Sequence, residues 1–229
     1  MTENRYHNLL AIETSTLSLK LALSFGEDRL VKSEEVVDRS HGQLLLKKIN
    51  ELFGSASLQK QDLEGIVVSV GPGSFTGLRI GLAAAKGMAV ALKIPIASVN
   101  LFEIAAYRLH EVREPVHVYV ALKRDEYVTA LIQEGAVVGG TMRTIFLAAM
   151  QSSEPDGFAA GVGFDIRDAL PSANAPDNRY QIRFDATDVL AVGRAKLQSD
   201  HHADLALLEP LYLQKSQAEI RFDQRHQKA

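Results

Sequence analysis

Residues 65–81 read GIVVSVGPGSFTGLRIG, and they carry the clearest structural signal in the chain. The continuous apolar run from Gly65 to Val70 is typical of a strand that is buried on both faces of a sheet. A glycine-rich turn follows, and the apolar residues after it predict a helix from Thr76 to Leu92. A strand, a turn and a helix in this order indicate an α/β layer with parallel strand pairing.

The stretches on both sides of this segment extend the same layer. Further strands are predicted at 8–12, 19–24, 30–37 and 96–99, and further helices at 40–53 and 101–110. Polar turns join the first three strands, which therefore form an antiparallel meander, and Gly54 is expected to end the first helix. Residues 1–110 are accordingly predicted to form one α/β lobe.

A charged bend at 111–115 marks the expected boundary to a smaller C-terminal α/β lobe, residues 111–229. Strands at 116–121 and 127–133 predict a hairpin around the polar residues 123–126. The remaining predicted elements are a helix at 144–151, a strand at 157–162, a Pro/Asn loop at 172–178, a helix at 187–198 and a charged tail from Gln217.

The composition of the 229 residues is that of a globular protein. Hydrophobic residues make up 46% and charged residues 23%, which excludes disordered and collagen-like classes. Cysteine is absent, so disulfides, thiolate metal sites and cysteine nucleophiles are excluded. The formal net charge of −3 gives no electrostatic basis for tight, independent binding of nucleic acid.

The sequence also bears on the protein's location. Its longest apolar stretch, Ile80–Leu92, is interrupted by Lys86 and is shorter than the roughly 20 residues of a membrane span. Residues 1–8 are polar and lack the pattern of a signal peptide. We therefore expect a cytoplasmic protein without a membrane partner.

The glycine-rich turn at 71–77 has two interpretations. It precedes a helix N-terminus, whose free N–H groups suit a phosphate or another anion, and a polar turn at 13–16 offers a second such place. On this interpretation a nucleotide or phosphate contacts Glu13, Thr14, Gly71, Gly73, Ser74 and Arg79. On the other, the glycines serve only a tight turn, since the pattern matches neither the P-loop nor the dinucleotide-binding fingerprint.

The helix predicted at 76–92 is apolar or small on all sides, with only Arg79 and Lys86 charged. A helix of this kind is buried on more than one side, either by the chain's own second layer or by a partner subunit. We favour a partner, because the lobe has few other helices to cover it. The predicted partner interface contains His41, Leu45, Ile49, Gly77, Gly81, Ala84, Ala85 and Met88.

Hydrolytic chemistry finds little support in the sequence. No Gly-x-Ser-x-Gly elbow is present. Residues 110–114 resemble a zinc-protease motif but end in Glu114, where a second histidine ligand is needed. The histidines in 200–204 are more typical of a solvated loop than of a metal site. We therefore assign no catalytic residue and no metal ligand.

Four segments together resemble one protein family. LAIETST at 10–16, RSHGQLL at 39–45, SVGPGSFTGLRIG at 69–81 and EPLYLQK at 209–215 are similar to the TsaB (YeaZ) proteins. The resemblance implies an actin-like ATPase fold (the sugar-kinase/Hsp70-like class) with two lobes. It also implies a role in the transfer of a threonylcarbamoyl group to adenosine 37 of tRNAs that read codons beginning with adenine.

The resemblance further implies a division of labour. A paralogue, TsaD, holds the metal and performs the transfer, a TsaE-like ATPase drives the cycle, and the TsaB subunit scaffolds TsaD and contacts tRNA only indirectly. Helices at 42–53 and 76–92 would form a four-helix bundle with the partner, or with a second copy when the chain is alone. No cofactor is expected on this chain alone, although ATP or ADP fits an interface in the complex.

The resemblance also allows a comparison with the metal site of the catalytic paralogue. The two histidine positions of that paralogue hold Leu101 and Ala105 here, and Glu103 lies between them. Neither Leu nor Ala ligates a metal, so a non-catalytic homologue is expected. This chain also has Glu13 and Ala121 where relatives carry Asp. An ATPase or small-molecule kinase, or less readily a peptidase, is the alternative.

Overall fold

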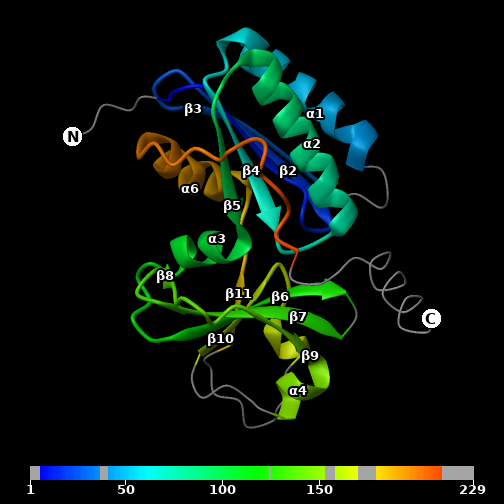
Figure 1. Ribbon diagram of the computed structural model, residues 1–229, viewed down its shortest axis with the longest axis vertical. Coiled ribbons are helices and arrows are strands. Elements are labelled where there is room, and N and C mark those ends of the chain that lie inside the picture. Colours follow the sequence, from blue (N-terminus) through cyan, green and yellow to red (C-terminus); the bar gives the residue numbers. More distant parts are fainter. Residues whose placement is uncertain (1–5, 37–40, 124, 153–157, 170–178, 213–229) are drawn as a thin grey trace.

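Two β-sheets lie one above the other, with a short helix between them (Figure 1). The computed structural model describes residues 6–36, 41–123, 125–152, 158–169 and 179–212. The predicted loop at 172–178, the tail from Gln217, Arg124 and the side chain of His41 lie outside the described residues.

The first sheet has five strands in the order β3-β2-β1-β4-β5. Their bounds are Leu9–Glu13 for β1, Ser18–Phe25 for β2, Arg29–Val36 for β3, Gly65–Gly71 for β4 and Ile96–Asn100 for β5. β1, β2 and β3 pair antiparallel, whereas β4 is parallel to both β1 and β5. The predicted meander and the predicted parallel layer are both confirmed.

Helices cover both faces of this sheet. α1 (His41–Ala56) and α2 (Phe75–Leu92) pack on one face, where Leu10, Ile12 and Val68 lie in the core beneath them. α3 (Leu101–Arg108) and α6 (Ala186–Gln198) lie on the other face (Figure 1). Because apolar side chains leave the strands on both faces, the sheet is buried on both sides, as the run at 65–70 predicts. A single 3₁₀ turn, η1 (Lys60–Asp62), precedes β4.

The first helix is longer than predicted. Gly54 lies inside α1 rather than at its end, so that prediction is wrong. Phe53 and Ala56 are buried in the core on either side of Gly54, and their packing outweighs the low helix propensity of glycine. Ser57 ends the helix with a φ of 53°, and the Leu58 N–H donates to the Phe53 carbonyl at 3.1 Å.

The second sheet has the order β11-β10-β6-β7-β8, and β9 also pairs with β7. The strand bounds are Val116–Lys123 for β6, Glu126–Gln133 for β7, Ala136–Val137 for β8, Arg143–Phe146 for β9, Phe158–Val162 for β10 and Arg179–Ile182 for β11. The hairpin of β6 and β7 is confirmed. The two α/β lobes agree with the actin-like ATPase fold that the resemblance implies, and the predicted fold class is confirmed.

The helix predicted at 144–151 is wrong in its first half. Thr144 and Ile145 belong to β9, where they pair with Val128 and Tyr127 of β7. The helical part is the short α4 (Leu147–Ser152), and a second short helix, α5 (Ile166–Ala169), follows β10. Pairing with the longer strand β7 is a tertiary effect that local sequence does not reveal.

The C-terminal part of the chain returns to the first sheet. α6 packs against β1, β4 and β5, so closely that a Cβ at Gly193 would lie 2.1 Å from Val67 Cγ1. Farther on, the Ala203 N–H donates to the Ile96 carbonyl at 2.8 Å. The two sheets divide near the predicted boundary at 111, but the first sheet is completed by residues from beyond that boundary.

α2 is long and apolar enough to cross a membrane by length and composition alone. In the structure it packs along the sheet instead, with Leu78, Leu82, Ala85 and Ala89 buried. A helix of a globular protein can pass the same test of length and composition, and one face of α2 packs on the sheet while the other is exposed.

Candidate functional site

The glycine-rich loop and the turn between β1 and β2 are packed directly on each other. The Ser74 N–H donates to the Ser15 carbonyl at 2.7 Å, and Thr14 Oγ1 donates to the Gly77 carbonyl at 2.8 Å. Both residues of the turn are buried. These bonds bring the 13–16 turn and the 71–77 turn together, the two places where the sequence predicts a phosphate contact.

Three glycines make this contact sterically feasible. A Cβ at Gly73 would lie 2.1 Å from the Ser15 carbonyl oxygen, and one at Gly77 would lie 2.0 Å from the Thr14 carbonyl oxygen. A Cβ at Gly81 would lie 2.2 Å from Thr14 Oγ1. Glycine is therefore required at these three positions for close packing of the loop on the turn. The phosphate contact at the six residues named above stays a prediction.

Glu13 organises the turn rather than facing outward. Its carboxylate is fully buried, and Oε1 accepts hydrogen bonds from the N–H and the hydroxyl of Ser15, both at 2.5 Å, and from the Thr16 N–H at 3.2 Å. The other oxygen, Oε2, has no hydrogen-bond partner among the described residues. Glu13 therefore stabilises its own turn as the Asp or Asn of an Asx-turn does, with a side chain that is one methylene longer.

Ser74 and Arg79 also have partners within the chain. Ser74 is the N-cap of α2, where its Oγ accepts from the Gly77 N–H at 3.2 Å. Arg79 Nε donates to the Tyr212 hydroxyl at 2.9 Å, and the guanidinium lies 3.8 Å from the centre of the Phe75 ring. Arg79 therefore fastens Tyr212 to Phe75 at the start of α2.

The residues predicted for the partner interface mostly point inward. Leu45, Ile49 and Ala85 are buried in the core beneath α1 and α2, and Gly77 and Gly81 face Thr14. An all-apolar helix does not reveal which of its faces meets the sheet, and within the single chain these five residues meet the sheet and the hairpin. Their contact with a partner stays a prediction.

The outward face of α1 and α2 is formed by residues that are neighbours in sequence of the predicted interface residues. Leu46 is 56% exposed and Val90 is 63% exposed. Ala83 and Gly87 of α2 are also exposed, and they add only small side chains to this surface. Ala84 and Met88 are partly buried at the edge of this surface.

The positions that correspond to metal-ligating histidines lie in the core. Leu101 and Ala105 are fully buried among apolar side chains. Glu103 Oε2 accepts from the Asn100 N–H at 2.8 Å, which caps α3, and Oε1 lies 2.6 Å from Lys196 Nζ. Over the described ranges, no group of three or more His, Asp or Glu side chains is arranged to hold a metal ion. These residues do not fit a metal centre.

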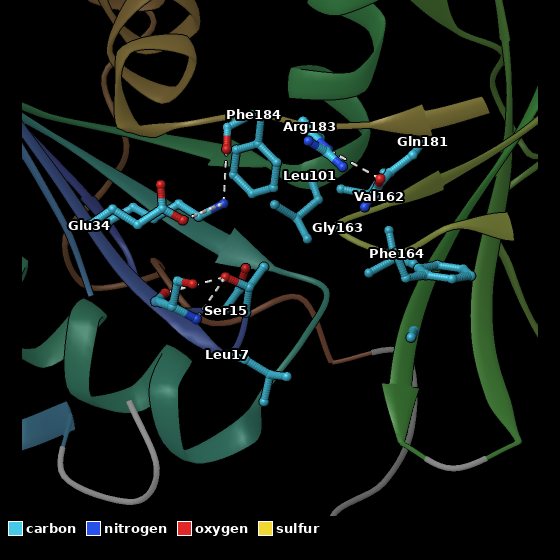
Figure 2. A pocket seen from close by; sticks show the side chains of 15 residues that line it. Ser15, Leu17, Glu34, Leu101, Val162, Gly163, Phe164, Gln181, Arg183 and Phe184 are labelled. Carbon is cyan, nitrogen blue, oxygen red and sulfur yellow. Dashed lines mark hydrogen bonds and ion pairs between the residues drawn. The ribbon is translucent and has the colours of Figure 1, made fainter. Parts of the chain in front are cut away.

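A cavity of about 490 Å³ lies between the lobes and was not predicted from the sequence (Figure 2). Its floor is formed by the turn after β1 and by Lys20 of β2. Lys20 is buried, and its Nζ donates to the Phe184 carbonyl at 2.9 Å and lies 3.7 Å from Glu34 Oε1. The signal that could have revealed the cavity is this lysine, a charged residue within the apolar strand LKLAL at 19–23.

A second ionic contact joins β3 to the start of α6. Lys32 Nζ of β3 lies 2.7 Å from Asp185 Oδ2, and the Asp185 carboxylate also accepts from the hydroxyl and the N–H of Thr187. Partial burial by itself would raise the pKa of Asp185. The hydrogen bonds from Lys32 and Thr187 outweigh burial and lower this pKa to about 2.

The lowered pKa predicts a pH-dependent contribution to stability. Since the carboxylate of Asp185 is easier to ionise in the folded chain, its contribution is complete above pH ~4, the unfolded pKa, and is lost as the pH falls towards 2. Asp185→Asn should lower the free energy of unfolding by about 1 kcal/mol at pH 7, because a partly exposed ion pair is worth little more. Urea unfolding of both proteins between pH 7 and pH 3 should show this difference shrinking; a constant difference would contradict it.

Comparison with known proteins gives a consistent set of relatives. The family model described as TsaD, tRNA N6-adenosine threonylcarbamoyltransferase, matches residues 33–154, more than half of the chain. The tRNA threonylcarbamoyladenosine biosynthesis protein TsaB of Haemophilus influenzae is 23% identical over 90% of this chain and 92% of its own length. The protein of the same name from Bacillus subtilis is 36% identical over 43% of each chain.

A solved structure extends this likeness to the fold. YeaZ from Pseudomonas aeruginosa superimposes with a TM-score of 0.71 at 25% sequence identity, covering 90% of this chain and 99% of that protein. Both lobes therefore have counterparts in that structure.

Proposed function

Because the chain belongs to the TsaB (YeaZ) family and takes part in tRNA threonylcarbamoyladenosine biosynthesis, we propose that it is a non-catalytic subunit that docks on a TsaD-like paralogue and activates it. The match to the TsaD family model supports a common origin with the transferase. Leu101 and Ala105, which cannot ligate a metal, support the division of labour. The proposed setting is the cytoplasm.

The observation that carries the proposal is the open face of α1 and α2. Leu46 and Val90 expose apolar side chains there, and Ala83 and Gly87 allow another helix to approach closely. A paired set of helices of the same kind on the paralogue would bury this face as a four-helix bundle. The same face would join two copies of the chain when the paralogue is absent.

The internal contacts of two predicted phosphate-binding residues argue against the alternative of an ATPase or kinase. Glu13 Oε1 accepts hydrogen bonds from Ser15 and Thr16 of its own turn, and Arg79 donates to the Tyr212 hydroxyl. We therefore assign ATP turnover in the complex to a TsaE-like partner. Any contact with tRNA would be made mainly by the other subunits, since this chain carries a net negative charge.

The test is size-exclusion chromatography with light scattering on the full chain, alone and mixed with the TsaD-like protein of the same genome. We expect a homodimer that exchanges into a heterodimer when the paralogue is added. Adding the chain should also increase threonylcarbamoylation of tRNA by the paralogue and its ATPase. A monomer that ignores the paralogue, or a chain that hydrolyses ATP by itself, would overturn the proposal.

A further inference from the structure

The cavity between the lobes contains a cation that has no carboxylate partner in the described part of the chain. Arg183, in the link between β11 and α6, lines the cavity, and its Nε donates to Gln181 Oε1 at 3.1 Å (Figure 2). No ion pair joins Arg183 to an acidic side chain within the described residues. The bond to Gln181 orients the guanidinium, and among the residues that the structure describes its two terminal NH₂ groups have no hydrogen-bond acceptor.

The other charges of the lining are already matched. Lys20 and Glu34 lie 3.7 Å apart, so the negative charge of Glu34 has its own cation. Glu13 is not part of the lining. Arg183 therefore gives the cavity a net positive charge, and a guanidinium with a free fork is suited to a carboxylate or a phosphate group.

Much of the lining is apolar. Leu101, Val120, Val162, Phe164 and Phe184 belong to it, and Leu101, Val162 and Phe184 lie beside Arg183 (Figure 2). Phe164 is supported from behind by the Tyr127 ring, with ring centres 5.6 Å apart. At about 490 Å³ the cavity has the size of ordinary small-molecule sites, which combine apolar walls with a few placed polar groups.

Arg183 also lines a second cavity, but that cavity does not suit an anion. It measures about 540 Å³ and is also lined by Gln181 and Arg183, together with Glu111 and Glu114. Two carboxylates in its wall would repel a negatively charged ligand. The side of Arg183 that faces the cavity between the lobes is therefore the better anion site.

We propose that this cavity binds a small organic anion, whose carboxylate or phosphate group pairs with Arg183 while its apolar body lies against Phe164 and Phe184. The site is separate from the helix face assigned to the partner subunit. None of residues 71–77 belongs to its lining.

The test uses the full chain and two simple probes that share one apolar ring, benzoate and phenyl phosphate, in calorimetric titrations. We expect saturable binding of at least one of them. Tighter binding of benzoate would identify the natural ligand as a carboxylate, and tighter binding of phenyl phosphate would identify it as a phosphate ester. Inorganic phosphate should bind more weakly than phenyl phosphate, because it cannot use the apolar walls.

Three variants locate the binding. Arg183→Gln should weaken it by roughly tenfold or more, since a hydrogen-bonded charge pair is lost. Ala121→Phe, at an exposed position of the lining, should fill the cavity and reduce binding similarly. Arg29→Gln removes an exposed arginine of β3 outside the cavity and should leave binding unchanged.

Two results would overturn the proposal: no binding of either probe at millimolar concentration, or equal binding by the Arg183→Gln protein and the unaltered chain. Either result would leave the docking experiment above unaffected, because that experiment measures association through α1 and α2.

Discussion

Replacing Gly77 by alanine should lower the free energy of unfolding by about 3 kcal/mol. The added Cβ would lie 2.0 Å from the Thr14 carbonyl oxygen, a distance that no side-chain rotation relieves, because both partners are backbone. Either α2 moves away from β1, or the bond from Thr14 Oγ1 to the Gly77 carbonyl breaks. Equilibrium unfolding in urea, followed by circular dichroism, measures the loss.

Gly87 provides the matched control within the same helix. A Cβ at Gly87 would have no atom within 4 Å, so Gly87→Ala adds only helix propensity. This change should raise the free energy of unfolding by about 0.5–1 kcal/mol. If Gly77→Ala proved as stable as the unaltered chain, the close packing of the loop on the turn would be refuted.

Replacing Ala83 by glutamate should weaken association with the TsaD-like paralogue by about a hundredfold, or ~3 kcal/mol. Ala83 lies on the exposed face of α2, and a docked helix would enclose the new carboxylate without a cation to pair with it. The fold should be unaffected, since glutamate is a good helix former at an exposed position. Calorimetric titration of one protein with the other gives the change.

Two further substitutions of the same type separate docking from folding. Ala148→Glu places the same charge on an exposed position of α4 in the second lobe and should leave association intact. Ala85→Glu places it in the core, where Ala85 is fully buried, and should instead prevent folding. Undiminished association of the Ala83→Glu protein would show that the paralogue docks elsewhere.

The sequence predicts the first lobe well because its signals are local. Five strands and the helices α1, α2 and α3 were predicted at nearly their observed places, since apolar runs and turn residues alternate there without ambiguity. The strands of the second lobe are harder to predict from the sequence. β8 has only two residues, and β9 and β11 have four each, too short for a periodic pattern to emerge.

The candidate sites show a different limit. A glycine permits both close packing and phosphate binding, so the pattern at 71–77 could not distinguish a filled loop from an open one. The distances from Gly73 and Gly77 to the hairpin reveal the close packing, which the sequence does not. The interface face of α2 was ambiguous for a related reason, because apolar side chains on all sides give no direction. Arg183 and Lys20 are 163 positions apart, and only the fold brings them to one cavity.

The return of α6 to the first sheet bears on how the chain is made. β1, β4 and β5 are complete by Asn100, but one face of their sheet is covered by a helix that begins at Ala186. α3 covers part of that face early, but the part beneath α6 stays uncovered during synthesis until most of the polypeptide has left the ribosome. A nascent chain halted before Ala186 therefore exposes Val67 and its neighbours to chaperones and proteases.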